Sequence, residues 1–168
     1  MAGLRLSASE AREAVEEFRN SNPKIVDLWG RLQNACEARM GGDYTLPLPC
    51  TQLNPALKRR LFYRSVARRG GELTALVAGR RVKVYGGLLA ENWTQATARD
   101  VLASAWLRCA DAGFLPVLSV HDELVFELPE SVAGQSMAVI KAILEQPLSW
   151  ASTLPLKVEG QLMNHYDK

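Results

Sequence analysis

Apolar residues in the N-terminal quarter of the chain recur at helical spacing. Residues 7–20 begin with Ser7 and Glu10, which have the spacing of a capping box, and continue as an amphipathic stripe. Pro23 suits the first turn of a second helix, whose apolar stripe reaches Cys36 before a Gly-Gly pair. The pattern predicts a helical hairpin packed on a larger body.

The next section changes to short β-type runs. These runs are 44–48, 61–66 and 73–77, and they are punctuated by prolines and by glycine pairs. The pair Gly70-Gly71 predicts a hairpin turn between the second and third runs. A second Gly-Gly pair, Gly86-Gly87, closes the section.

The C-terminal half alternates helical and strand patterns. Residues 88–112 lack a single apolar stripe, which predicts a helix buried on more than one side. Two apolar runs within 115–129 flank three titratable residues and predict a hairpin with a charged turn. An amphipathic helix at 131–146 and a closing strand at 154–158 follow.

Hairpin-grouped strands among helices predict an α+β fold instead of a doubly wound sheet. The length of 168 residues fits a single domain, 1–168, which we divide into three sections: a helical hairpin (1–42), a basic β section (43–87), and a part with the long helix, charged hairpin, helix and closing strand (88–168).

Composition narrows the class of protein. Hydrophobic residues make up 48% and charged residues 23%, which is typical of a globular protein. The chain has no apolar run long enough to span a membrane, and its three cysteines form no Cys-x-x-Cys pair. We expect a cytoplasmic protein with reduced thiols that does not act at a membrane.

Charge is segregated along the chain although the net charge is only +2. Residues 58–83 carry nine Lys or Arg and one Glu, whereas residues 84–168 carry five basic and ten acidic residues. Phe62 and Tyr63 interrupt the basic run, a pattern that suits contact with nucleic-acid phosphates and bases. The other interpretation is a solvated strand pair whose apolar residues Leu61, Phe62 and Val66 face the core, and composition leaves both open.

The triplet His121-Asp122-Glu123 is the strongest candidate for chemistry. It is either the exposed tip of a hairpin or a source of carboxylate ligands of the kind that Mg²⁺ prefers. Two-metal sites need carboxylates from separate segments, so this triplet supplies part of such a site at most. A Ser-His-Asp hydrolase fits poorly, because the chain has no G-x-S-x-G motif.

Four segments carry a resemblance: 85–100 (YGGLLAENWTQATARD), 120–127 (VHDELVFE), 22–29 (NPKIVDLW) and 155–160 (PLKVEG). Together they resemble the C-terminal palm region of phage-type family A DNA polymerases, in which 120–127 corresponds to motif C. The resemblance implies that Asp122 is a metal-binding aspartate for Mg²⁺, that Glu123 supports the metal site, and that His121 lies near the primer end.

The same resemblance implies contacts with a DNA primer-template. Gln95 and Asn92 would donate to minor-groove acceptors, which every base pair offers, so base sequence is not read. The remaining nucleic-acid contacts that we expect are Arg99 on the same predicted helix and the basic residues Lys58, Arg59, Arg60 and Arg64.

The departures from the family pattern concern the nucleotide-binding half. Nothing matches motif A, D-Y-S-x-I-E-x-R, or the fingers helix of motif B, and Leu88 stands where phage-type relatives usually have Lys. We therefore expect a polymerase part that is inactive alone. It needs either a second polypeptide carrying motifs A and B or the missing half of the same enzyme. The alternatives are a non-catalytic nucleic-acid-binding or regulatory protein, and an interaction protein that uses the helix faces of Phe18 and Trp29.

Overall fold

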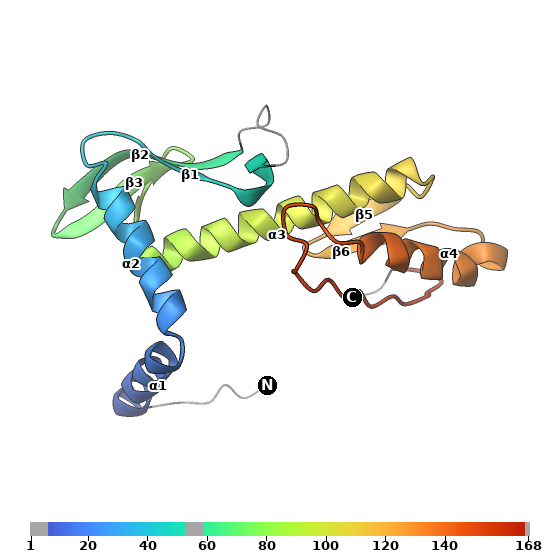
Figure 1. Ribbon diagram of the computed structural model, residues 1–168, viewed down its shortest axis with the longest axis horizontal. Coiled ribbons are helices and arrows are strands. Elements are labelled where there is room, and N and C mark those ends of the chain that lie inside the picture. Colours follow the sequence, from blue (N-terminus) through green and yellow to red (C-terminus); the bar gives the residue numbers. More distant parts are fainter. Residues whose placement is uncertain (1–6, 53–58, 167–168) are drawn as a thin grey trace. The chain divides into compact units, whose positions relative to one another are not determined.

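A computed structural model describes residues 7–52 and 59–166, which form an α+β fold (Figure 1). Their contacts divide into two compact units. Unit 1 contains the described residues 7–46 and 60–94, and unit 2 contains 47–52, 59 and 95–166. The description of residues 1–168 as a single domain stays a prediction, because two compact units occur within single domains as well as in separate ones.

The two N-terminal helices form where the sequence predicts them. In α1 (Ala8–Ser21) the backbone N–H of Glu10 donates to Ser7 Oγ, and Glu10 accepts from the Ser7 N–H at 2.8 Å, which confirms the capping box. Asn22 alone links α1 to α2 (Pro23–Glu37).

The two helices contact each other through an aromatic pair: the rings of Phe18 and Trp29 stack with centroids 6.2 Å apart. No residue of α1 is buried by the described part of the chain, so its apolar stripe is not core here.

Unit 1 is built around a four-stranded sheet in the order β1-β2-β3-β4. Its strands are β1 (Tyr44–Pro47), β2 (Arg60–Arg69), β3 (Glu72–Val77) and β4 (Arg80–Lys83). Gly70-Gly71 forms the predicted two-residue turn, with both φ angles positive. The sequence pattern missed β4, which follows a second such turn at Ala78-Gly79.

One face of this sheet carries the core of unit 1. Tyr63, Val66 and Leu73 are buried there together with Cys36 of α2 and Leu89, near the start of α3 (Gly86–Asp111). Alternation in β2 is interrupted by a register shift between Arg64 and Ala67. Because of this shift, both Tyr63 and Val66 reach the core although they are three positions apart.

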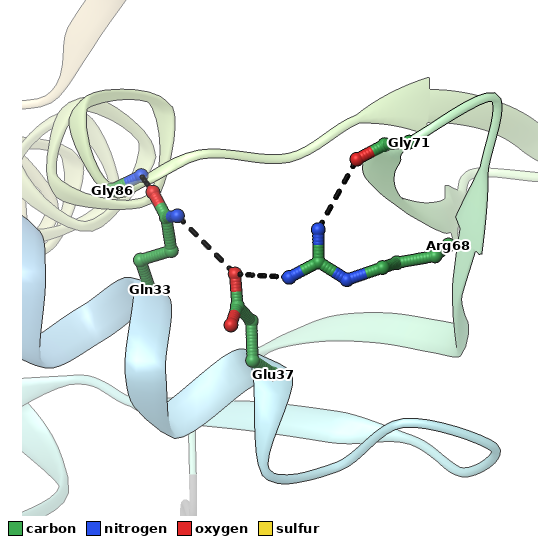
Figure 2. Close-up of polar contacts among 5 residues, drawn as sticks. All are labelled: Gln33, Glu37, Arg68, Gly71 and Gly86. Atoms are coloured by element: carbon green, nitrogen blue, oxygen red, sulfur yellow. Dashed lines mark hydrogen bonds and ion pairs between the residues drawn. The ribbon is translucent and has the colours of Figure 1, made fainter.

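A polar network joins α2 to the start of α3 and to the β2–β3 turn (Figure 2). The Glu37 carboxylate lies between the Gln33 amide and the Arg68 guanidinium, each 3.3 Å away. Gln33 Oε1 in turn accepts from the Gly86 N–H at 3.2 Å, and Arg68 donates to the carbonyl of Gly71 at 3.1 Å. The network fixes the point at which the long helix begins.

Unit 2 contains the later turns of α3, a hairpin of β5 (Pro116–Val120) and β6 (Glu123–Phe126), and α4 (Glu130–Leu144). Cys109, Ala105 and Ile140 are buried in it. Arg108 Nε donates to the carbonyl of Ile143 at 3.4 Å, which ties α3 to α4. A short 3₁₀ helix, Pro49–Gln52, also belongs to this unit.

The predicted closing strand at 154–158 is wrong, because these residues form no strand in the structure. Pro155 has no N–H to donate to a ladder, and the N–H of Val158 donates to the Glu145 carboxylate at 2.9 Å instead of to a neighbouring strand. Across the described ranges, no helix is long and apolar enough to cross a membrane.

Candidate functional site: an acidic hairpin turn and a basic sheet face

The β5–β6 hairpin presents the triplet His121-Asp122-Glu123 at its tip. Val120 pairs with Glu123, so the turn proper consists of His121 and Asp122, and Glu123 is the first residue of β6. All three are exposed. His121 has φ +52°, a left-handed conformation that is uncommon for residues other than glycine and in which histidine is among the better tolerated. The predicted hairpin with a charged turn is confirmed.

The two carboxylates at this tip have different surroundings. Glu123 Oε2 accepts a hydrogen bond from the hydroxyl of Tyr166 at 3.2 Å, so the C-terminal segment touches the turn. Asp122 makes no hydrogen bond or ion pair with residues 7–52 and 59–166. Its carboxylate is therefore available to a ligand from solution or from another chain.

The donor set suits part of a magnesium site. Carboxylate oxygens are the ligands that Mg²⁺ prefers, and it commonly takes one or two of them together with substrate phosphates. Within the described residues, no three His, Cys, Asp or Glu side chains are placed to hold a metal ion together. Asp122 and Glu123 carry the kind of oxygen that such an ion takes, and its remaining ligands would come from elsewhere.

The residues expected to contact DNA from α3 are placed differently from one another. Gln95 and Arg99 are exposed. Asn92 is half-buried, and its amide donates to the Tyr63 hydroxyl at 3.0 Å. Burial raises the pKa of Tyr63, and the hydrogen bond from Asn92 partly opposes that rise. Asn92 therefore already has a structural partner in unit 1.

Arg59 pairs with a buried carboxylate that sequence reasoning did not single out. Its Nε lies 2.9 Å from Asp100 Oδ1, and the Cys50 thiol donates to Asp100 Oδ2 at 2.7 Å. Asp100 and Cys50 are both buried, and burial followed by the hydrogen bond to Asp100 raises the pKa of Cys50. Asp100 belongs to the segment 85–100 of the sequence analysis, but no local sequence pattern indicates that it is buried.

Lys58, another residue expected to contact nucleic acid, lies outside the described residues.

The basic residues of β2 lie on the sheet face opposite the core. Arg60, Phe62 and Arg64 alternate with Leu61 and Tyr63 and are exposed. The interpretation that Leu61, Phe62 and Val66 face the core is wrong for Phe62, which is 50% exposed. It is confirmed for Val66, which is buried, and for Leu61, which packs against the core. Tyr63 is also buried. The Arg64 guanidinium lies over the Phe62 ring, 5.5 Å from its centroid, and 3.4 Å from the Asp43 carboxylate.

Fold and site together define an α+β chain that carries an exposed acidic hairpin turn and a basic sheet face. The chain is 31% identical to the DNA polymerase of Bacillus phage SP02 over 185 aligned positions, which cover 97% of this chain and 28% of that polymerase. No family model and no solved structure matches the chain. The similarity shows a relationship to a DNA polymerase, of which the chain spans less than a third.

Proposed function

We propose that the chain is the C-terminal palm part of a template-directed DNA polymerase of family A. The observation that carries the proposal is the similarity to a phage DNA polymerase along 97% of the chain, together with the exposed turn at His121-Asp122. The nucleic-acid substrate is a DNA primer-template. The protein works in the cytoplasm, which for a phage protein is that of the host.

In this proposal Asp122 and Glu123 help to hold Mg²⁺. The ion, when bound, would neutralise charge on the transferring phosphoryl group and activate the primer 3′-hydroxyl. Asp122 is available to it, and Glu123 is oriented by Tyr166. His121 lies beside the primer end, where an exposed imidazole contacts the terminal nucleotide. Gln95 and Arg99 contact the duplex, and the basic residues of β2 contact nucleic-acid phosphates.

A second polypeptide, or the missing half of the same enzyme, completes the active site in this proposal. The described residues supply too few ligands for a metal ion, and the chain lacks sequence matching motifs A and B. In and beside β5, Leu115 and Val117 are 70% and 60% exposed. Both lie at the end of β5 away from the turn, and apolar side chains exposed on such a hairpin are typical of a surface that a partner covers. The partner carries the remaining carboxylates and the triphosphate-binding residues.

Affinity purification followed by primer extension tests the proposal. The tagged chain is recovered from cells that express it naturally, its partners are identified by mass spectrometry, and the eluate is assayed for extension. We expect a partner with motifs A and B and Mg²⁺-dependent extension that Asp122→Ala abolishes. Asp111→Ala is the matched control, because Asp111 is an exposed aspartate at the end of α3. Extension unaffected by Asp122→Ala would overturn the role of this turn.

A non-catalytic nucleic-acid-binding or regulatory protein is the second candidate function. The basic face around Phe62 favours it, since binding there needs no metal ion. Such a protein binds DNA with an affinity that falls with salt and ignores Asp122→Asn. A different partner, no extension, and DNA binding unchanged by Asp122→Asn would establish this function.

A further inference from the structure

The strand register defines the surface on the open side of the unit 1 sheet. Arg64 pairs with Leu76, and Leu76 pairs with Arg81, so these residues point to one face. Thr74 and Lys83 form the next row of that face. The opposite face carries the buried core of unit 1. We call the open surface the outer face.

The outer face is strongly basic. Its exposed or half-exposed charged residues are the cations Arg60, Arg64, Arg69, Arg81 and Lys83 and the carboxylates Asp43 and Glu72. Asp43 pairs with Arg64, and Glu72 pairs with Lys83. Arg81 donates to the Thr74 hydroxyl and the Ser65 carbonyl. Arg60 and Arg69 have no ion pair with the described residues, so their charges are available to an anionic ligand.

Phe62 gives this face a second kind of recognition group. Its side chain is exposed beside Arg60 and Arg64, and the Arg64 guanidinium over the ring holds the ring in place by a cation–π contact. An exposed Phe62 contributes less to the free energy of unfolding than a buried one, so folding alone does not explain an aromatic residue at this position. An aromatic ring among arginines on an open sheet matches the way in which proteins bind single strands, with rings stacking on bases and cations contacting phosphates.

We propose that the outer face binds a single-stranded segment of nucleic acid, with Phe62 stacking on an unpaired base and Arg60 and Arg69 contacting phosphates. A single strand is favoured over a duplex because the base faces in a duplex are already covered by their neighbours. The inference rests on the proposed function for the nature of the ligand. It adds a binding site separate from the acidic hairpin turn and independent of metal.

Fluorescence anisotropy with the full chain tests this site without a partner or nucleotides. The probes are a labelled oligo-dT and a duplex of equal length, measured in EDTA. Phe62→Leu keeps the apolar bulk but removes the aromatic face, and we expect it to weaken oligo-dT binding about tenfold with little effect on the duplex. Phe18→Leu is the matched control, since Phe18 is 46% exposed on α1 and lies outside the outer face. Thermal melts establish that both variants fold.

Equal oligo-dT affinity of Phe62→Leu and the unsubstituted chain would overturn the inference, as would the absence of oligo-dT binding. Its failure is distinguishable from failure of the proposed function. A chain that binds oligo-dT through Phe62 but never supports primer extension keeps this site and loses the polymerase role. A complex that extends primers, in a chain whose oligo-dT binding is unchanged by Phe62→Leu, keeps the polymerase role and loses this site.

Discussion

At the scale of single residues, Asn92 and Arg59 have tertiary partners that the sequence motifs do not predict. Both belong to segments predicted to contact DNA, yet Asn92 donates to Tyr63 and Arg59 pairs with Asp100. Partners at separations of 29 and 41 positions leave no local signal, because side-chain pairing over that distance depends on how the chain folds back. His121 and Asp122, in contrast, lie where the local pattern predicts them, since a two-residue turn is decided by its immediate neighbours.

The buried thiol of Cys36 predicts a loss of stability at high pH. Burial, with a smaller contribution from the negative charge of Glu37, raises the pKa of Cys36 from 9.0 to about 11. Between these values the unfolded state releases the proton while the folded state keeps it, so the free energy of unfolding falls as pH rises. The expected loss is on the order of 2 kcal/mol.

Urea unfolding at pH 8 and pH 11 measures this loss in the unsubstituted chain and in Cys36→Ala. Burial also raises the pKa values of Tyr44 and Tyr63, and this contribution is present in both proteins. The smaller rise that the charge of Cys36 causes in both tyrosines is lost with the thiol, so it belongs to the difference that is measured. We expect Cys36→Ala to lose less stability over this interval. The same loss in both proteins would show that the thiol does not titrate differently on unfolding.

At the scale of elements, the start of α3 depends on a close approach between Gly86 and the backbone of α2. The sequence pattern indicates only that the Gly86-Gly87 pair separates a strand from a helix. A Cβ at Gly86 would lie 2.1 Å from the Trp29 carbonyl oxygen, which is impossible without a shift of one helix. The network of Gln33 and Glu37 then holds this contact in place (Figure 2).

Gly86→Ala is therefore expected to destabilise the chain by about 2 kcal/mol or more. Gly30→Ala is the matched control, because Gly30 lies within α2 and a Cβ there meets nothing within 4 Å. That variant is expected to gain about 0.5–1 kcal/mol from the higher helix propensity of alanine. Chemical denaturation of both measures the difference, and equal stabilities would show that α2 and α3 do not approach so closely.

At the scale of the whole molecule, the basic stretch at 58–83 divides between the two units. Arg59 belongs to unit 2 and pairs there, whereas Arg60, Arg64 and Arg69 belong to unit 1 and its sheet. Within this one basic stretch, the fold therefore pairs some cations, such as Arg59, with carboxylates and leaves others, such as Arg60 and Arg69, available to a ligand. Electrostatic binding of nucleic acid is therefore expected to depend on unit 1 residues.

Salt dependence of oligo-dT affinity tests this sorting. Each phosphate contact to a single strand adds about 0.7 to the slope of log affinity against log salt. We expect Arg60→Gln with Arg69→Gln to lower that slope by about 1.4. The pair Arg12→Gln and Arg19→Gln on α1 removes equal charge away from the sheet and should leave it unchanged. Equal slopes in both double variants would assign the effect to net charge alone.

The sequence by itself determined the helices, most strands, the α+β class and the acidic hairpin turn. The capping box, the glycine turns and hydrophobic alternation act over a few residues, so the sequence alone predicts them. The sequence pattern missed β4 and wrongly predicted a strand at 154–158, where the N–H of Val158 donates to Glu145. Only the tertiary structure decided that Tyr63 is core while Phe62 is surface, because a strand's alternation leaves open which of its two faces meets the helices.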